Sequence, residues 1–172
     1  MSKLIGEKLN DDLYQRLLGH DLERDAEKVI LLSTIDEGGW PHPAMLSYFE
    51  VIAKDRHNLG FATYKNSRTT NNMRRNGKAT VSIIDERVAY YVKGNVSEVD
   101  GEMRCAPHNA NLNLRVNQVF ADEVNEEFEP GAYVLCGVTY RNPRPKEELQ
   151  KAREVLEELA AWSAELSIRF LI

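Results

Sequence analysis

The residues best suited to chemistry lie between positions 61 and 77. An apolar segment runs through Phe61 and Ala62, a short polar loop follows, and a brief helix is expected to begin at Ser67 and end at Asn76-Gly77. The basic residues of this stretch and its next position are Lys65, Arg68, Arg74, Arg75 and Lys78, and no acidic residue interrupts them. Unpaired N–H groups at a helix start attract anions, and nearby cations strengthen that attraction. The stretch therefore predicts a site for a phosphate group.

Arg68 is the side chain most suited to hold that phosphate. Charge-assisted hydrogen bonds to phosphate oxygens contribute about 1.5–3 kcal/mol each. A cation in the first helical turn is otherwise mildly unfavourable against the helix dipole, and a bound anion would reverse that. Ser67 is expected to cap the helix, which is compatible with a phosphate contact. Thr69 and Asn72 are weaker candidates, whereas Arg74 and Arg75 are typical of an exposed helix face.

Composition excludes several other classes of function. The chain has 172 residues, 42% apolar and 28% charged, with a net charge of -5. This length suits one domain, and the negative balance argues against general nucleic-acid binding. No apolar run approaches the roughly 20 residues needed to cross a bilayer, and the first residues lack a secretory apolar core. We therefore expect a cytoplasmic protein without a membrane partner, with Cys105 and Cys136 reduced.

The hydrophobic pattern predicts a mainly β domain with peripheral helices. Strands are expected over 29–35, 42–53, 59–63, 78–84, 88–99 and 132–140. Helices are expected over 10–18, 67–76, 104–121 and 146–162, with a further helical turn over 21–27. Short consecutive strands joined by hairpins favour a small antiparallel barrel. We expect a single domain over 1–172, with an N-terminal helical segment over 1–27 and the C-terminal helix at 146–162.

Other reactive residues give weaker signals. Cys105 and His108 have a spacing that metals use, but a structural zinc site needs four ligands and only two are visible, so no metal site is expected. His42 lies on a predicted strand, although a lone histidine is more often a packing or surface residue. Asp122–Glu129 is an acidic run, most simply a solvated loop. No Ser-His-Asp or Cys-His arrangement can be assembled, and no catalytic residue is assigned.

The order of four motifs resembles a known family. A glycine turn leads into Gly39-Trp40-Pro41-His42-Pro43, and a later strand ends at Thr63. Ser67-Arg68-Thr69 and Asn72-Met73-Arg74-Arg75-Asn76 then follow. Over residues 26–100 this arrangement is similar to the pyridoxamine 5'-phosphate oxidase-like family of FMN-binding split barrels. The resemblance implies a six-stranded antiparallel split barrel of Greek-key type with short flanking helices. It also implies a homodimer that holds FMN at the subunit interface.

The resemblance also implies which residues contact the cofactor. The segment 45–47 would lie along the flavin ring, the strand end 61–63 would border the ring and ribityl chain, and 67–69 would hold the phosphate. With Lys65 and Asn72 added, the expected cofactor residues are Met45, Leu46, Ser47, Phe61, Ala62, Thr63, Lys65, Ser67, Arg68, Thr69 and Asn72.

Three positions depart from the family pattern. The oxidase has an arginine and a lysine where this chain has Ala44 and Phe49, and its Ser-Arg-Lys segment ends here in Thr69. These replacements remove cations from the phosphate and substrate sites, and they argue against oxidation of pyridoxamine phosphate itself. Lys65, two residues before Ser67, could offset the missing charge.

Three functions are compatible with the sequence. The first is an FMN-dependent oxidoreductase that acts on an unknown small substrate. The second is a non-catalytic FMN-binding module, such as a flavin store, redox sensor or stress protein. The third is a barrel without flavin that acts through its dimer surface or binds another ligand such as haem. Flavin absorption and turnover with a nicotinamide would separate the three.

Overall fold

The computed structural model describes residues 2–143 and 145–169, with Pro145 and residues 162–169 described by their backbone alone. The strands are β1 (Ser2–Gly6), β2 (Val29–Ile35), β3 (Pro41–Ser47), β4 (Val51–Ala53), β5 (Asn58–Tyr64), β6 (Lys78–Asp85), β7 (Val88–Asp100) and β8 (Asn109–Asp122). The helices are α1 (Asp11–Arg16), α2 (Leu22–Asp25), α3 (Arg68–Asn76) and α4 (Pro145–Arg169).

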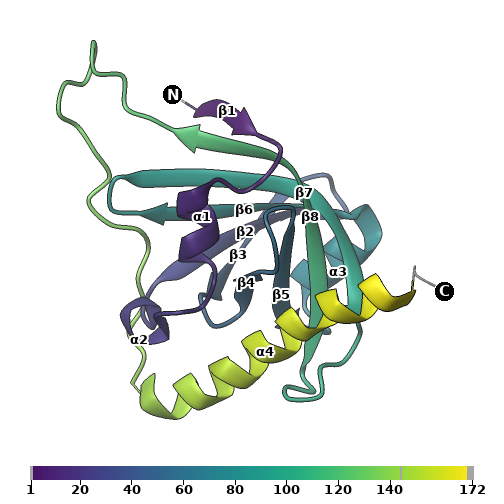
Figure 1. Ribbon diagram of the computed structural model, residues 1–172. Helices are drawn as coiled ribbons and strands as arrows, with labels where there is room; N and C mark the ends of the chain where they lie inside the picture. Colours follow the sequence, from purple (N-terminus) through teal and green to yellow (C-terminus); the bar gives the residue numbers. More distant parts are fainter. Residues whose placement is uncertain (1, 144, 170–172) are drawn as a thin grey trace.

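The strands form one antiparallel sheet in the order β3-β2-β6-β7-β8-β5-β4, and β1 pairs with β8 beside this path. The strands at the two ends of the order, β3 and β4, are joined by the short turn 48–50. The sheet therefore bends back on itself without a closing hydrogen-bonded pair, which makes a split barrel (Figure 1). The structure thus confirms the predicted antiparallel split barrel with flanking helices, but with eight strands among the described residues rather than six.

The core has two parts. One fills the barrel, where Ile30, Val81 and Leu112 are completely or almost completely buried. The other lies between the barrel and α4, where Phe49 and Leu159 meet. Figure 1 shows α4 running across one end of the barrel beside β4 and β5. This helix turns an apolar stripe toward the barrel, since Ala152, Leu156 and Leu159 are buried and Leu149 packs against them.

Local signals place the first hairpin and α3 as predicted. β2 is rich in β-branched and aliphatic residues, and the Asp36 carboxylate accepts hydrogen bonds from the N–H groups of Gly38 and Trp40, both at 2.9 Å. In α3, the Ser67 hydroxyl caps the helix by accepting from Thr70 N–H at 3.2 Å. Gly77 ends α3 in the left-handed conformation, with φ at 61°, which favours glycine.

The helix predicted over 104–121 is wrong, because most of this segment is β8, paired with β7 and β5. Leu112, Leu114 and Val116 alternate with polar residues, which is the strand period. A bulge opposite the Lys93–Gly94 step then inserts one extra residue, so the next buried position is Val119. Leu112, Val116 and Val119 are therefore four and three positions apart, which is the spacing of buried residues on one face of a helix.

The strand predicted over 132–140 is also wrong. This segment makes only an isolated bridge between Thr139 and Lys28, although Val138 C=O accepts a 3.0 Å hydrogen bond from Val29 N–H. Gly137 is pressed against the barrel, since an added Cβ would lie 1.9 Å from the carbonyl oxygen of Ile84. The segment therefore lies along the end of the barrel without joining its ladder.

Three further boundaries differ from prediction. The strand expected over 42–53 is broken into β3 and β4 by the turn at 48–50. The N-terminal segment 1–27 contains β1 besides α1 and α2, and α4 runs on to Arg169.

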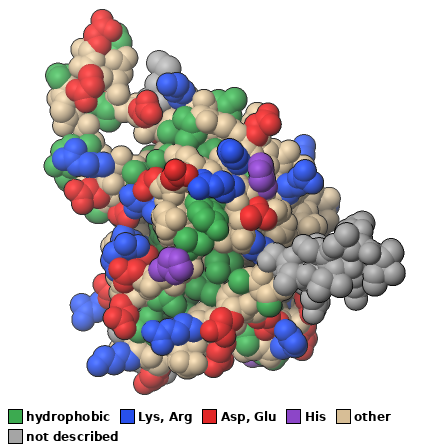
Figure 2. Space-filling model, in the orientation of Figure 1, with side chains coloured by type: hydrophobic (Ala, Val, Ile, Leu, Met, Phe, Trp, Pro, Cys, Tyr) green, Lys and Arg blue, Asp and Glu red, His purple; other side chains and the backbone are tan. Residues whose placement is uncertain are grey.

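The run Asp122–Glu129 leaves the barrel in a projecting loop, and Figure 2 shows acidic side chains on that projection, as expected of a solvated segment. Among the described residues, no helix is long and apolar enough to cross a membrane.

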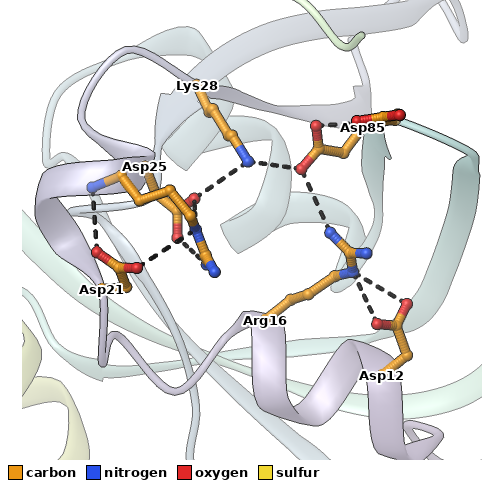
Figure 3. A network of polar contacts seen from close by, with 8 residues as sticks. Asp12, Arg16, Asp21, Asp25, Lys28 and Asp85 are labelled. Atoms are coloured by element: carbon orange, nitrogen blue, oxygen red, sulfur yellow. Dashed lines mark hydrogen bonds and ion pairs between the residues drawn. The ribbon is translucent and has the colours of Figure 1, made fainter. Parts of the chain in front are cut away.

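A network of ion pairs fixes α1 and α2 against the barrel (Figure 3). Asp85, at the end of β6, accepts from Lys28 at 2.6 Å and from Arg16 at 3.3 Å. Lys28 also lies 3.2 Å from Asp25, and Arg16 lies 2.9 Å from Asp12. Because Asp85 of β6 pairs with Arg16 of α1 and with Lys28 ahead of β2, it links three separate segments and is the centre of the network.

The ion pairs of Asp85 should stabilise the fold only above strongly acidic pH. Burial by itself raises the pKa of Asp85, but the Lys28 hydrogen bond, the Glu86 N–H and the charges of Lys28 and Arg16 bring it below its usual value. The stabilisation is therefore fully present above the unfolded pKa of about 3.9 and is lost as pH falls through the lower folded pKa. We expect Asp85→Asn to cost about 1 kcal/mol of unfolding free energy at neutral pH. Urea unfolding should show the difference between variant and wild type shrinking below about pH 4; a constant difference would contradict this role.

Candidate functional site

The split of the barrel holds a cavity of about 730 Å³. One wall is the edge strand β3, the opposite wall is the end of β5 with the segment 105–109, and α4 closes one side. The residues that line the cavity include Met45, Leu46, Ser47, Phe49, Glu50, Tyr64, Cys105, His108, Tyr140, Glu148 and Lys151. The cavity therefore lies along the strand that the sequence predicts to contact a flavin ring.

The three predicted residues of β3 all line this cavity, but in different ways. The Met45 side chain is 68% exposed, whereas Leu46 is buried in the barrel. Ser47 donates two hydrogen bonds to the Glu50 carboxylate, from its N–H at 2.7 Å and from its hydroxyl at 2.9 Å. The hydroxyl proton of Ser47 is thus already engaged inside the protein.

The predicted residues at the end of β5 are buried. Phe61 and Ala62 are completely inaccessible, and Thr63 is 3% exposed. The Thr63 hydroxyl lies 2.6 Å from the hydroxyl of Thr70 and so ties the strand end to α3. Their side chains are part of the core, so only backbone groups could contact a ligand from here.

A short loop connects the rim of the cavity to the start of α3. Tyr64 lines the cavity, and its carbonyl oxygen accepts from Ser67 N–H at 2.9 Å. Lys65 N–H donates to the carbonyl oxygen of His108, which also lines the cavity, at 2.9 Å. The cavity and the helix start are therefore neighbouring parts of one site.

The start of α3 has unused hydrogen-bond donors. Within the described part of the chain, the N–H groups of Arg68 and Thr69 have no hydrogen-bond partner, and the exposed guanidinium of Arg68 has no ion pair. The first N–H groups of any helix lack partners inside the helix, so an anion can be bound there. Arg68 and these amides form the part of the predicted phosphate site that is free to bind.

The other predicted residues near α3 are engaged within the protein. The Lys65 ammonium pairs with Glu102. Asn72 is 5% exposed, donates to the Thr34 hydroxyl at 3.1 Å and accepts from Arg75 at 2.9 Å, so it fixes α3 on β2. Thr69 is 7% exposed. These three side chains therefore serve the fold in this structure.

Acidic residues from other parts of the chain neutralise most of the basic residues between positions 65 and 78. Besides the Lys65 pair, Arg74 contacts Glu98 at 2.5 Å and Arg75 contacts Glu37 at 3.0 Å. These acidic residues come from distant segments and neutralise three of the five cations. Arg68 and Lys78 are the two cations of the stretch without an ion pair among the described residues.

Sequence reasoning missed the polar residues of the cavity that lie outside the family motifs. Glu50 has no local signal, because its environment is created by α4, which lies about a hundred positions further along the chain. Burial raises the pKa of Glu50, the hydrogen bonds from Ser47 lower it, and the charge of Glu148 raises it further. His108 stood out only for its spacing from Cys105.

Cys105 is not suited to act as a nucleophile. Burial, together with the hydrogen bond to Glu158 and its charge, raises the pKa of the Cys105 thiol to about 12. Glu158 of α4 also accepts from the N–H groups of Arg104 and Cys105 at 2.8 and 2.9 Å, so it holds the helix against the cavity wall. Among the described residues, no group of three or more His, Cys, Asp or Glu side chains could hold a metal ion.

A second hollow of about 560 Å³ lies on β2, β6, β7 and β8. Its lining includes Lys78 and Lys93 but none of the eleven residues predicted to contact the cofactor. The split of the barrel is therefore the better candidate for the functional site.

A family model and one relative match most of this chain. The family model described as pyridoxamine 5'-phosphate oxidase matches residues 21–135. The uncharacterized protein YclD of Bacillus subtilis (strain 168) is 31% identical over 155 residues, which cover 88% of this chain and 95% of YclD.

Two solved structures share the fold at low identity. A candidate pyridoxamine 5'-phosphate oxidase from Lactobacillus delbrueckii has a TM-score of 0.55 and 18% identity, covering 70% of this chain and 99% of its own. HupZ of Group A Streptococcus has a TM-score of 0.54 and 13% identity, covering 68% of this chain and 96% of its own. The family match spans about two thirds of the chain, and the split-barrel fold agrees with it. The chain belongs to the pyridoxamine 5'-phosphate oxidase-like family.

Proposed function

We propose that the protein binds FMN in the split of the barrel and is an FMN-dependent oxidoreductase that acts on a small substrate. The observation that carries this proposal is the continuity between the cavity along β3 and the start of α3, through the loop 64–67. A flavin ring requires an open strand edge, and its phosphate requires a cationic corner with free donors. In this protein the exposed edge of β3 and the start of α3 with Arg68 are joined by the loop 64–67.

At the phosphate end, the N–H groups of Arg68 and Thr69 and the guanidinium of Arg68 would hold the anion. Ser67 keeps these amides in place, because its hydroxyl caps the helix at Thr70 N–H. The Lys65 ammonium contributes only if it exchanges its pair with Glu102 for the phosphate. The fit therefore depends mainly on Arg68.

At the ring end, β3 offers its backbone and the exposed Met45 side chain, and the strand end 61–63 offers only backbone. Bound flavin supplies the redox chemistry, while the chain orients it and shields it from water. α4 and the segment 105–109 would perform this shielding, because both line the cavity. No acid–base residue is assigned, so β3, the strand end 61–63, α4 and the segment 105–109 have a binding and positioning role.

The replaced cations limit the substrate. Phe49, which stands where the oxidase has a lysine, is 6% exposed and packs in the apolar cluster under α4. Ala44 carries no charge, and Thr69 is 7% exposed. We therefore propose a substrate other than pyridoxamine phosphate.

The deciding experiment is a titration of the purified protein with FMN, followed by visible absorption and flavin fluorescence. Binding should perturb the flavin band and quench its fluorescence, and oxidation of NADH or NADPH should then show turnover. Bound flavin without turnover on a panel of acceptors would favour a non-catalytic flavin-binding or redox-sensing module. No spectral change on adding FMN would refute the flavin proposal.

We also propose that the protein is a homodimer. Trp40 and Met45 are 72% and 68% exposed on the β2–β3 hairpin, and Ile35 beside them is 41% exposed. Exposed apolar side chains gathered on one sheet edge are typical of a surface that another chain covers. Sedimentation should therefore give a mass near twice 19.6 kDa. A single species at the mass of one chain would contradict the dimer.

A further inference from the structure

Glu50 is a carboxylate of the cavity with one unused oxygen. It lies in the turn between β3 and β4 and lines the cavity. Its Oε2 atom accepts both hydrogen bonds from Ser47. Its Oε1 atom has no hydrogen bond and no ion pair with the described residues, and the fold does not seal that atom from solvent. A molecule that enters the cavity can therefore reach Oε1.

The charges around Glu50 leave it without a cationic partner. Glu148 of α4 lines the same cavity, and its carboxylate accepts from the Asn142 amide at 2.7 Å. Lys151 and His108 also line the cavity, but neither forms an ion pair with Glu50 or Glu148 within the described residues. Two acidic residues and one lysine thus line one cavity, and the negative charge of the two acids makes the neighbourhood of Glu50 attractive to positive charge.

Burial makes an unpaired charge at Glu50 costly. Desolvation raises the pKa of Glu50, the two bonds from Ser47 lower it only in part, and the charge of Glu148 raises it again. Tyr140 lines the same cavity, and its pKa is raised first by burial and then by the charges of Glu148, Glu50 and Glu27. A positively charged donor at Oε1 would remove this cost, whereas an anion would increase it.

We propose that Glu50 makes this cavity selective for substrates that carry a positively charged N–H group, such as an ammonium or an amidinium, over anionic ones. The inference rests on the proposed function, because it assigns a substrate class to the same cavity. The nitrogen would donate to Oε1, while Ser47 keeps the carboxylate oriented through Oε2. Glu50 is then a specificity-determining residue.

A matched pair of probes tests this selectivity without knowledge of the substrate. Benzylamine, which is a cation at neutral pH, and benzoate, an anion with the same ring, would be titrated into the isotopically labelled full chain and followed by NMR. We expect benzylamine to shift the amide signals of Ser47 and Glu50 and to bind at least about tenfold more tightly than benzoate. Equal binding, or tighter binding of benzoate, would overturn the inference.

Two variants assign the effect to one carboxylate. Glu50→Gln should weaken benzylamine roughly tenfold and remove the preference over benzoate. Glu157→Gln removes the same charge from the exposed face of α4, outside the cavity, and should leave both affinities unchanged. An unchanged preference in Glu50→Gln would overturn the inference. If Glu50→Gln does not fold, the affinities of benzylamine and benzoate for the wild-type chain still test whether the cavity prefers the cation.

The same sample separates this inference from the flavin proposal. FMN binding without a preference for benzylamine would overturn the selectivity assigned to Glu50 and leave the flavin function standing. A preference for benzylamine without any FMN binding would support the selectivity and refute the flavin function.

Discussion

Replacing Gly94 by alanine should destabilise the protein by about 3 kcal/mol, near the upper end of the usual cost of overpacking. Gly94 lies at the bulge where β7 pairs with β8. An added Cβ would lie 2.3 Å from the carbonyl oxygen of Arg115 and 2.4 Å from the Leu114 side chain. The oxygen belongs to the backbone of the neighbouring strand, so one of the two strands must move. For a domain of this size, such a loss lowers the melting temperature by roughly 6–12 °C.

Gly101→Ala is the matched control for this prediction. A Cβ at Gly101 would meet only the Glu98 carboxylate, at 3.3 Å, so a shift of a few tenths of an ångström that keeps the Arg74–Glu98 pair makes room for it. Its unfolding free energy should stay within about 0.5 kcal/mol of wild type. Thermal and urea unfolding of both variants measure the difference. Equal stability of Gly94→Ala and wild type would mean that the two strands are not packed as closely as the bulge requires.

Local sequence signals were sufficient wherever neighbouring residues decide the structure. The bounds of β2 agree with prediction at both ends, because a dense β-branched run stops at a turn that Asp36 stabilises. α3 agrees because Ser67 and Gly77 supply both of its caps. Each of these features depends on contacts within a few positions along the chain.

Prediction failed where pairing between distant strands decides the structure. The bulge in β8 lies opposite the Lys93–Gly94 step of β7, and nothing near Val116 in sequence indicates this. The segment 132–140 has strand-like composition, but β2 is already paired with β3 and β6, so only one bridge to Lys28 forms. An alternating pattern predicts the strand conformation and cannot predict whether a partner edge is free.

The same distinction applies to the site. The helix start and its free amides could be predicted from positions 64–70, and the structure places them there. The ion pairs that neutralise Lys65, Arg74 and Arg75 could not, because Glu102, Glu98 and Glu37 come from other strands and loops. If a phosphate binds at the start of α3, its electrostatic attraction is therefore concentrated at Arg68, and replacing Arg68 should have the largest effect on its binding.

Arg68→Ala should weaken FMN binding by roughly tenfold or more, because it removes charge-assisted hydrogen bonds of about 1.5–3 kcal/mol each. The fold should tolerate the change, since Arg68 is exposed and has no ion pair among the described residues. Fluorescence titration at fixed, low ionic strength would measure the two dissociation constants. Added salt should reduce the difference between them, because it screens an exposed cation.

Lys78→Ala separates a local contact from a general charge effect. Lys78 is exposed and, within the described residues, has no ion pair, so its loss changes the net charge as much as the loss of Arg68. It follows the C-terminal cap of α3, whose nine residues span roughly 13 Å at the usual rise per residue. If the phosphate is bound at the start of α3, Lys78→Ala should change the affinity less than twofold. Equal losses in the two variants would place the phosphate elsewhere, since only a long-range field acts alike on both ends of the helix.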